Sequence, residues 1–518
     1  MPEISVGKPP LWQRAWFQLT LVLVVAACIY WPMLGSSGFA FSEGQRVFPG
    51  WAFAREGDWW MPRLLDQPYL RKPPGMPWAV GAFALLFGES EYSARAVSAL
   101  AVTLGGILAF AFARRWFGGV WGLIAGLAFL LTPLYWYPGR SAEIEALHNL
   151  FVQLAMLSAI DIIVNRPRTR ASLLWAIPFA LGLAGMATVK GPAALPALIG
   201  ALTGACIAAR SARGLVTGHL ITGFLIALAF LAFVAGRILE RSADLPEAPV
   251  LQGAEQFLWK PGRRLEVLIL PASALLAALP WSAPLLLALA RPQDRDTREH
   301  TLGRAVSFSV LAALAIYTVI GVYNNRYTMP ITTLLPIVTA YAGWRLSRHD
   351  LPAWGQRVAR HSLMHRPWVW GLALLMAALT SLVYTEHRRD VRTSGRDTGE
   401  RLGELLPDGA LLTGDLLMDH RPEVAWYARE RAAKLRKSIT VRWTPAHKNG
   451  QGQFPLPPPG SFIALLELPL DPDQPSELEQ WHAAGMLAGL QQVHIDAAHK
   501  FVFRVYRVLP MERLVAKP

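Results

Sequence analysis

Residues 16–46 read WFQLTLVLVVAACIYWPMLGSSGFAFSEGQR, an apolar run that ends in a carboxylate and a guanidinium. About 20 consecutive apolar residues are enough to cross a hydrocarbon core of roughly 30 Å as a helix. The run is too long and too rich in Trp for a secretory leader, and no clear cleavage pattern follows it. We therefore expect a retained first membrane span, with Ser42, Glu43 and Arg46 just beyond its end.

The composition of the whole chain also points to a membrane protein. The 518 residues are 53% hydrophobic, include 20 Trp and have a positive mean hydropathy. Apolar stretches recur between residues 17 and 384, and they predict a polytopic α-helical protein with about 11 to 13 transmembrane helices. Cys28 and Cys206 both lie in apolar runs, so neither a disulfide framework nor a thiolate metal site is expected.

The net charge of +14 is explained by basic segments that set membrane orientation. We therefore expect no nucleic-acid partner, and we expect membrane lipids around the apolar helices. The N-terminus is then cytoplasmic, and residues 78–87 must lie along the interface instead of crossing. The basic segments are residues 114–115, 166–170, 210–213, 291–304 and 345–360; the outward loops are residues 42–92, 139–143, 190–191, 237–266 and 323–327.

The chain after residue 386 is predicted to be a small soluble α/β domain on the outer side. We expect residues 1–385 to form the transmembrane domain, whose outer loop at 42–92 holds juxtamembrane helices, and residues 386–518 to form the extracytoplasmic domain. Helical patterns cover residues 397–406 and 475–489, and strand patterns cover residues 439–443, 462–468 and 501–508.

Charged side chains are concentrated in the outward loops. In the first loop, Lys72 lies between Arg71 and the rigid pair Pro73-Pro74. Cations beside a tyrosine suit a phosphate at headgroup depth, because charge-assisted bonds to phosphate oxygens are strong. Anchoring in the lipid headgroups is the alternative for such residues, and for Lys72 we favour phosphate binding.

The second outward loop, GRSAEIEALHNLF at residues 139–151, opens a predicted helix. Glu145 and His148 are three residues apart and share a helix face, whereas Glu143 is turned by about 200° from Glu145. Acidic residues in a first turn also complement the helix dipole. An ionisable residue at the end of a span is nonetheless a functional candidate, so we assign Glu145 to the site. Further candidates in the outward loops are Arg140, Lys190, Arg326 and Tyr327.

In their order along the chain, these motifs resemble those of the lipid-phosphate-dependent glycosyltransferases of the GT-C superfamily. The resemblance is to the branch that contains aminoarabinose transferases and protein O-mannosyltransferases, and it covers about residues 15–345. The segments that carry it are Ser42-Glu43, GDW at 57–59, PYLRKPP at 68–74, FGESEYSAR at 87–95, GRSAEIEALHNLF at 139–151, TVKGPAALP at 188–196, LPWSAPLL at 279–286 and NNRYTMP at 324–330.

The resemblance implies a polyprenyl-phosphate sugar donor and transfer of the sugar to a lipid or protein acceptor at the outer face of a plasma (inner) membrane. It implies that Tyr69 and Lys72 hold the donor phosphate, that Arg326 or Tyr327 helps, and that Lys190 lies near the same cavity. The sequence departs from the family pattern in three places: Ser42 replaces the usual catalytic Asp, Gln45-Arg46 replaces an Arg-Tyr pair, and Glu145 replaces a second Asp.

For the mechanism, we assign Glu43 as the base or acceptor-orienting group and Glu145 as a second carboxylate, with Lys72 and either Arg46 or Arg71 as the phosphate clamp. The opposite assignment, with Glu145 as the base and Glu43 paired to a cation, stays open. Supporting roles are assigned to Ser42, Arg140 and His148.

The sequence leaves open whether a divalent metal is used, since no ligand spacing requires one. Two other functions fit the sequence less well. A lipid-linked sugar flippase or transporter is disfavoured because the candidates cluster on one membrane face, whereas alternating access places sites near the midplane. A catalytically inactive family member is suggested only by the change at Ser42.

Overall fold

The computed structural model describes most of the chain, and its contacts divide it into two compact units. The first contains Met1–Leu34, Leu70–Met76 and Arg95–Val383, and the second contains Gly35–Tyr69, Pro77–Ala94 and Tyr384–Pro518. The residues outside the described part are 1–9, 41, 66, 71, 166–175, 244–271, 291–296, 321–324, 362–366, 393–394, 414–421, 443–459, 468–489, 499–500 and 509–518.

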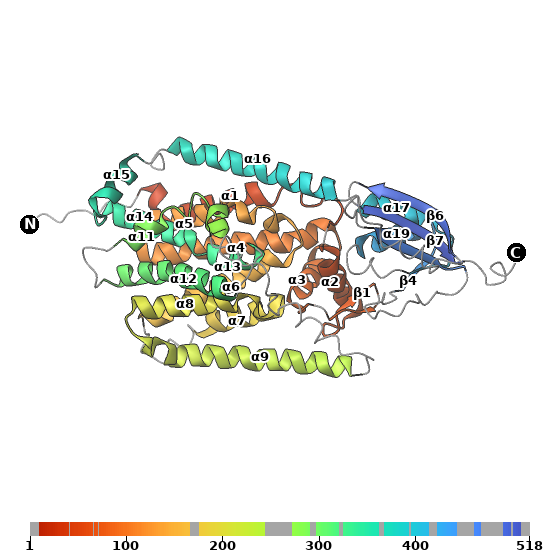
Figure 1. Cartoon of the computed structure of the whole chain (residues 1–518), viewed down its shortest axis with the longest axis horizontal. Helices are drawn as coiled ribbons and strands as arrows, with labels where there is room; N and C mark the ends of the chain where they lie inside the picture. Colours follow the sequence, from red (N-terminus) through yellow and green to blue (C-terminus); the bar gives the residue numbers. More distant parts are fainter. Residues whose placement is uncertain are drawn as a thin grey trace, which may run out of the picture. The chain divides into compact units, whose positions relative to one another are not determined.

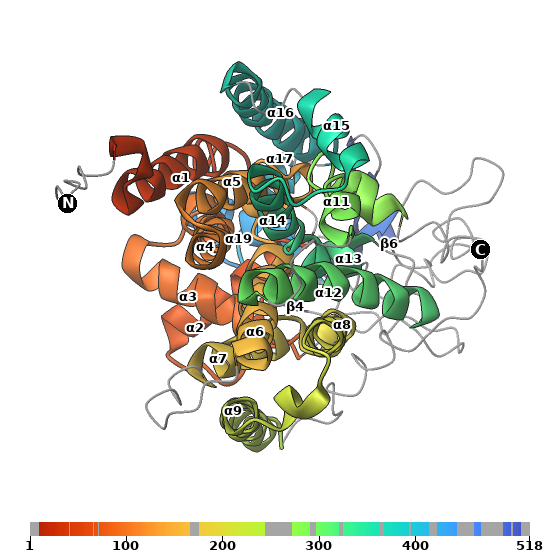
Figure 2. The same cartoon turned by 90° about the vertical axis from the view of Figure 1, so that its left-hand side faces the viewer.

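The first unit is a bundle of helices (Figures 1 and 2). Helix α6 packs on α7, α8 and α12, and α9 packs on α7 at the rim. Most of α4 and of α16 also belongs to this unit. The helices are α1 (Ala15–Tyr30), α4 (Glu91–Phe117), α5 (Gly119–Leu130), α6 (Ile144–Asn165), α7 (Ala176–Lys190), α8 (Leu195–Ala208), α9 (Gly218–Ser242), α11 (Leu285–Leu289), α12 (Arg298–Ile320), α13 (Asn325–Thr332), α14 (Leu335–Ser347), α15 (Ala353–His361) and α16 (Pro367–Arg392).

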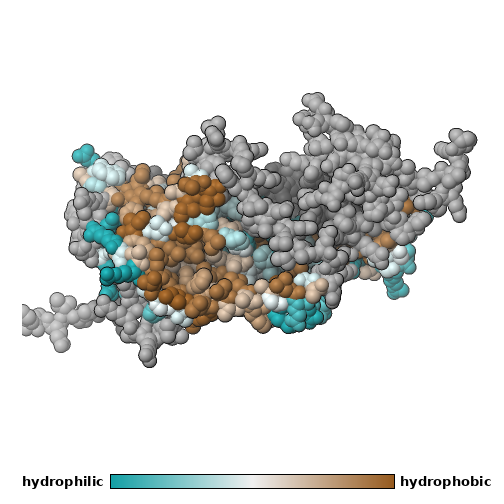
Figure 3. Space-filling view, turned by 60° about the horizontal axis from the view of Figure 1, so that its bottom comes forward, coloured by the Kyte–Doolittle hydropathy of each residue, from teal (hydrophilic) through white to brown (hydrophobic). Residues whose placement is uncertain are grey.

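Several of these helices are long and apolar enough to cross a membrane. In the described part, five stretches pass this test: Glu91–Phe117, Ile144–Asn165, Ala176–Ala208, Gly218–Ser242 and Arg298–Ile320. A bent pair, Gly119–Leu130 with Pro133–Arg140, would make a sixth. Apolar residues dominate the described helical surface in Figure 3. The prediction of a polytopic helical membrane protein is confirmed, and the total of about 11 to 13 spans stays a prediction.

The short apolar segment predicted to lie along the interface is helical. It belongs to α3 (Gly75–Phe87), which has 13 residues. A helix of that length extends over about 20 Å and is too short for a hydrocarbon core of roughly 30 Å. Its placement along the interface stays a prediction.

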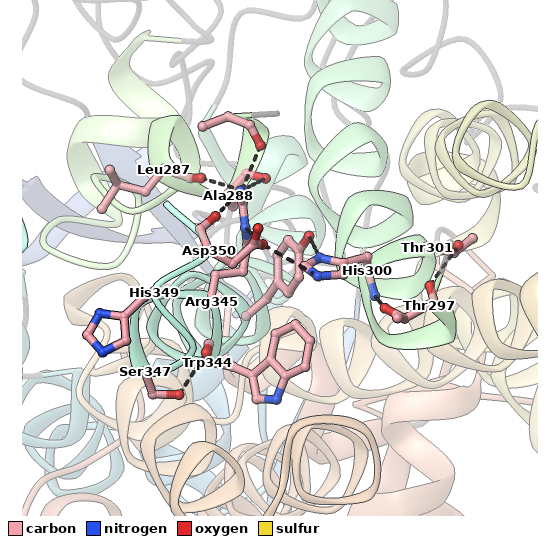
Figure 4. A network of polar contacts seen from close by, with 12 residues as sticks. Leu287, Ala288, Thr297, His300, Thr301, Trp344, Arg345, Ser347, His349 and Asp350 are labelled. Atoms are coloured by element: carbon pink, nitrogen blue, oxygen red, sulfur yellow. Dashed lines mark hydrogen bonds and ion pairs between the residues drawn. The ribbon is translucent and has the colours of Figure 1, made fainter. Parts of the chain in front are cut away.

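Arg345, near the end of α14, is fully buried and joins the ends of several helices (Figure 4). Its guanidinium donates to the carbonyl oxygens of Leu287 at 2.9 Å and Ala290 at 2.6 Å, which close the end of α11. Its Nε donates to Asp350 Oδ2 at 3.0 Å, and the same oxygen lies 3.4 Å from Nε2 of His300 on α12. One arginine of the predicted cytoplasmic cluster at 345–360 is therefore an internal helix cap.

The second unit combines most of the first outward loop with the end of the chain. It contains a five-stranded sheet in the order β4-β3-β5-β7-β6. Strand β3 is parallel to β4 and β5, while β7 is antiparallel to β5 and β6. Helix α19 connects the parallel strands β3 and β4, as parallel pairing requires a crossover. The elements are α2 (Gly44–Glu56), β1 (Arg63–Leu64), β2 (Gln67–Pro68), most of α3, α17 (Gly395–Leu405), β3 (Ala410–Thr413), α19 (Pro422–Lys434), β4 (Ile439–Arg442), β5 (Phe462–Glu467), β6 (Leu490–Ala498) and β7 (Phe501–Val508).

The structure confirms the predicted helix at 397–406 as α17 and the three predicted strands as β4, β5 and β7. Strands β3 and β6 and helix α19 were not predicted, and the predicted helix at 475–489 lies outside the described residues. The prediction that residues 1–385 are membrane-embedded and residues 386–518 are not stays a prediction. By contacts, most of the first outward loop folds with the α/β part, whereas its segment Leu70–Met76 belongs to the first unit.

Candidate functional site

A buried carboxylate at the start of α6 lies between two cations from other elements. Glu145 is 6% exposed, and its Oε1 lies 3.4 Å from Nζ of Lys190 and 3.8 Å from Nη1 of Arg326. Lys190 ends α7 and Arg326 lies in α13, so three segments far apart in the sequence meet at this carboxylate. The structure brings together three of the residues that the sequence predicted for the site.

The backbone around Lys190 explains how this side chain reaches Glu145. Gly191 has φ of +66°, a left-handed conformation that glycine adopts without strain and that ends α7 at Lys190. A cation in the last turn also complements the helix dipole. The Nζ of Lys190 is 4.9 Å from the centroid of the Tyr327 ring, a cation–π distance. Tyr327 therefore lies beside Lys190 in the cluster with Glu145, as expected for a site residue.

Arg326 is the more accessible of the two cations. Half of its side chain is exposed, so an incoming anion can reach its guanidinium. Burial lowers the pKa of Arg326, but the combined attraction of Glu145, Glu143, Tyr137 and Tyr327 outweighs burial and raises that pKa above its ordinary value. Arg326 therefore keeps its positive charge at any physiological pH.

The helical-wheel argument that separated Glu143 from Glu145 was wrong, because α6 begins only at Ile144. Glu143 precedes the helix, so the spacing of about 100° per residue does not apply to it. It is 3% exposed and acts on Arg326 together with Glu145. Glu143 is therefore a site candidate that the sequence argument set aside. Pro138 could have indicated this, because it begins a separate short turn, Pro138–Arg140, so that α6 starts only after Glu143.

His148 is also buried beside this centre. It is 2% exposed and interacts electrostatically with Lys190 and Glu145. Its Nε2 has no hydrogen-bond partner within the part of the chain that the structure describes. The predicted shared face of Glu145 and His148 is consistent with this placement.

Arg140 has a structural role that the sequence did not reveal. It is fully buried, and its guanidinium donates to the carbonyl oxygens of Ile29 at 3.0 Å and Pro32 at 2.8 Å. These carbonyls lie at and just beyond the end of α1. Arg140 therefore joins the second outward loop to the end of α1.

Lys72 lies in a turn that packs on the end of α7. A Cβ added at Gly75 would meet the carbonyl carbon and oxygen of Thr188 at 2.8 Å, so the two backbones are in close contact. Thr188 is two residues before Lys190, and no more than about 10 Å of chain separates Lys72 from Gly75. The Lys72 segment and the Lys190 segment are thus neighbours, and the partly exposed Lys72 stays a predicted phosphate ligand.

Glu43 precedes α2 in the second unit. It is 1% exposed, and its Oε2 accepts a hydrogen bond from the backbone N–H of Ala40 at 2.9 Å. Ser42 is partly exposed, and Tyr69 follows β2. The other predicted residues are Arg46, which is buried in the first turn of α2, and Arg71, which lies outside the described residues. The roles assigned to Glu43, Ser42, Arg46, Arg71 and Tyr69 stay predictions.

The described residues offer little to a metal ion. They contain no group of three or more His, Cys, Asp or Glu side chains placed to hold one. Glu145 and His148 lie close to Lys190, and a cationic side chain competes with a metal for the carboxylate.

Known proteins match a part of the chain that contains several of the candidate residues. A family model described as dolichyl-phosphate-mannose-protein mannosyltransferase matches residues 71–235, which include Lys72, Glu145 and Lys190. The undecaprenyl phosphate-alpha-4-amino-4-deoxy-L-arabinose arabinosyl transferase of Pectobacterium carotovorum is 27% identical over 174 residues, or 33% of this chain and 30% of that protein. The protein of the same name from Edwardsiella ictaluri is 27% identical over 144 residues, or 28% of this chain and 26% of that protein. The match thus spans less than a third of these relatives.

The fold is similar over almost the whole chain to a solved structure. The crystal structure of ArnT from Cupriavidus metallidurans bound to undecaprenyl phosphate gives a TM-score of 0.63 at 17% identity and covers 95% of this chain and 98% of that one. The same protein in the apo state gives a TM-score of 0.64 at 17% identity, with coverage of 94% and 97%. Fold and sequence together confirm that the chain resembles the GT-C glycosyltransferases of the aminoarabinose transferase branch.

Proposed function

We propose that the chain is an integral membrane glycosyltransferase that moves a sugar from a polyprenyl-phosphate donor to a lipid or protein acceptor. We further propose that transfer takes place at the outer face of the plasma membrane, with the N-terminus in the cytoplasm. The observation that carries the proposal is the cluster of Glu145, Lys190 and Arg326, because it combines a buried carboxylate with two cations at one point.

The reaction requires the bond between the sugar C1 and the phosphate oxygen to break while C1 bonds to the acceptor. The phosphate leaves with the electron pair of the broken bond, and the acceptor gives up a proton. Fixed cations stabilise the charge that develops on the leaving phosphate. We assign this role to Lys190 and Arg326, helped by Lys72, and the half-exposed Arg326 gives the phosphate access to the cluster.

The proton of the acceptor requires a carboxylate, and Glu145 is our first choice. It is held by two cations, so a phosphate that draws Lys190 and Arg326 toward itself would leave Glu145 able to accept a hydrogen bond from the acceptor. Glu43 is the alternative base, as the sequence first suggested. In that case Glu145 would only orient the cations, and Ser42 would orient Glu43.

The test measures sugar transfer by the purified protein in the presence of lipid extract from the producing cells. We expect Glu145→Gln to lower kcat by about 100-fold or more, as removal of a general base does. The matched control is Glu404→Gln, which changes an exposed carboxylate of α17 and should leave transfer unchanged. A larger loss for Glu43→Gln than for Glu145→Gln would make Glu43 the base. Full activity in both variants would refute the carboxylate mechanism. Movement of the lipid-linked sugar across the membrane without sugar transfer would refute the proposal that the protein is an enzyme.

A further inference from the structure

Helix α19 contacts the segment that carries Glu43. Tyr427 of α19 is 2% exposed, and its hydroxyl accepts a hydrogen bond from the backbone N–H of Phe39 at 3.0 Å. The same hydroxyl donates to Oε1 of Glu91 at 2.7 Å. Phe39 lies just before the first outward loop and Glu91 lies at its end. One hydroxyl group therefore ties α19 to both ends of that loop.

Arg396 of α17 reinforces this hydroxyl. Its guanidinium pairs with Oε1 of Glu91 and lies 5.3 Å from the centroid of the Tyr427 ring. Burial and the charge of Glu91 raise the pKa of Tyr427 well above its ordinary value, so the phenol stays a donor. The three side chains form a connected polar group in which Tyr427 is buried and Arg396 is partly exposed.

Aromatic packing holds α19 against α2 beside this polar group. The ring of Trp426 stacks on Phe48 with centroids 5.4 Å apart, and it lies 5.1 Å from Trp51. At the start of α2, a Cβ on Gly44 would meet Cγ of Pro422 at 2.9 Å and the backbone N of Glu423 at 3.3 Å. The two helices are therefore in close contact at Gly44, the residue after Glu43.

The short loop between these anchors is closed on itself. Glu43 Oε2 accepts from Ala40 N at 2.9 Å, and the backbone N–H groups of Arg46 and Val47 donate to the Glu43 carbonyl oxygen, each at 2.9 Å. The backbone N–H of Ala40, the residue after Phe39, thus helps to fix the position of the Glu43 carboxylate. Tyr427 is the side chain that holds this backbone at its start.

We propose that α19 is a positioning element for the acidic loop, and that Tyr427 fixes the backbone at Phe39 so that Glu43 keeps one position. Tyr427 does not touch the reacting atoms; it acts through the loop. The consequence for transfer rests on the proposed function, whereas the ordering of the loop does not. The α/β part would then contribute to catalysis through α19, although the strands of its five-stranded sheet bear none of the candidate residues.

The test compares Tyr427→Phe with Arg431→Gln in the full-length protein in detergent. Tyr427→Phe keeps the ring, with its packing and its contact with Arg396, and removes the two hydrogen bonds. Arg431→Gln breaks an exposed pair between α19 and Glu404 of α17 and serves as the matched control. The first readout is hydrogen–deuterium exchange of the peptides that cover residues 36–48. The second is transfer kinetics.

We expect Tyr427→Phe to speed exchange at Phe39 and its neighbours by about tenfold, because a buried hydrogen bond of ordinary strength is lost. We expect kcat to fall by about five- to tenfold with the donor KM unchanged. Glu91→Gln keeps an oxygen that accepts from Tyr427, so its effect on exchange should be smaller. Arg431→Gln should change neither readout.

Unchanged exchange in Tyr427→Phe would overturn the proposal, and so would faster exchange with unchanged kcat. If Tyr427→Phe unfolds the whole second unit, exchange will also be faster in the strands. The test then uses Glu91→Gln: faster exchange at residues 36–48 with a lower kcat supports the proposal, and no change in either readout overturns it. If the wild-type protein shows no transfer, the proposed function fails, and the exchange data still decide whether α19 holds the loop.

Discussion

Glu145 shows how one buried carboxylate organises the site. Lys190 is 8% exposed and lies closest to it, and Arg326 is half-exposed and lies farther away. A buried ion pair contributes little net stability, but removal of one partner leaves an uncompensated charge. The arrangement is therefore better explained by chemistry at the site than by the stability of the fold.

Lys190→Gln is expected to impair both transfer and stability. The substitution removes a cation that stabilises the leaving phosphate, so kcat should fall by about 10- to 100-fold. It also breaks a buried pair, at a cost of about 3–5 kcal/mol in the free energy of unfolding. Transfer assays and thermal unfolding in detergent measure the two effects.

Lys190→Arg should recover part of the activity, since it keeps the charge. Lys434→Gln is the control, because Lys434 forms only an exposed pair with Glu430 and should change neither quantity. Wild-type transfer by Lys190→Gln would remove this residue from the phosphate site.

The sequence predicted which residues belong to the site better than it predicted what each residue does. Glu145, Lys190 and Arg326 were found because charged residues at the ends of spans are costly and need a reason. The role of Arg140 could not be predicted, since the carbonyl oxygens that it binds lie more than 100 residues earlier. Glu143 was set aside because the start of α6 was placed too early.

Among the elements, the ends of α11, α12 and α14 depend on Arg345. It is the only group that both caps α11 and pairs with Asp350 among the contacts of Figure 4. We expect Arg345→Met to lower the free energy of unfolding by about 3–5 kcal/mol, because the largely buried Asp350 loses the guanidinium that pairs with it.

The control for Arg345 lies three residues further on. Arg348 is exposed and stands 4.8 Å from the centroid of the Trp344 ring, so Arg348→Met should cost no more than about 1 kcal/mol. Thermal unfolding of both variants in detergent makes the comparison. Equal melting temperatures for the two variants would show that the Arg345 network does not hold these helices.

The contact between the Lys72 turn and α7 gives a second prediction for elements. Gly75→Ala places a methyl group 2.8 Å from the backbone of Thr188, which cannot move as a flexible side chain would. We expect a loss of about 1–3 kcal/mol in the free energy of unfolding, together with a higher KM for the donor, because Lys72 is displaced.

Gly236→Ala is the matched substitution for Gly75→Ala. It lies within α9 with no atom within 4 Å of the added methyl group, so it should be neutral or slightly stabilising. Donor KM and melting temperature are measured for both. An unchanged KM in Gly75→Ala would separate the Lys72 turn from donor binding.

Element types followed from the sequence where the pattern was long or regular. The long apolar helices and the strand patterns that became β4, β5 and β7 are of this kind. Strand β3 reads Ala-Leu-Leu-Thr, without alternation, and β6 alternates weakly, so neither gave a clear period. Three of the buried residues of helix α19 are alanines, Ala425, Ala428 and Ala432, and they give only a weak hydropathy signal.

For the whole molecule, the predicted orientation is open to a direct test. Cys28 and Cys206 are replaced by Ser, and single cysteines are placed at the exposed positions Ala212 and Asp408. A membrane-impermeant maleimide should label Asp408→Cys in intact cells, because the α/β part is predicted to face outward. Ala212→Cys should be labelled only after the membrane is opened, since it lies in a basic segment. The opposite pattern would invert the topology.

The grouping of the chain into two units was beyond what the sequence could show. Hydropathy separates membrane segments from polar ones, so it places the boundary after residue 385. The contacts of Tyr427 with Phe39 and Glu91 instead join segments more than 300 residues apart. Such pairings depend on packing and leave no local pattern.

The central claim is that the protein consumes a polyprenyl-phosphate sugar through the cluster around Glu145. The most direct test is mass spectrometry of the membrane lipids in cells that lack the protein and in cells complemented with the wild type or with Glu145→Gln. We predict that a polyprenyl-phosphate sugar accumulates without the protein, that the wild type removes it, and that Glu145→Gln, expressed at the same level, does not. Identical lipid profiles with and without the protein would contradict the claim.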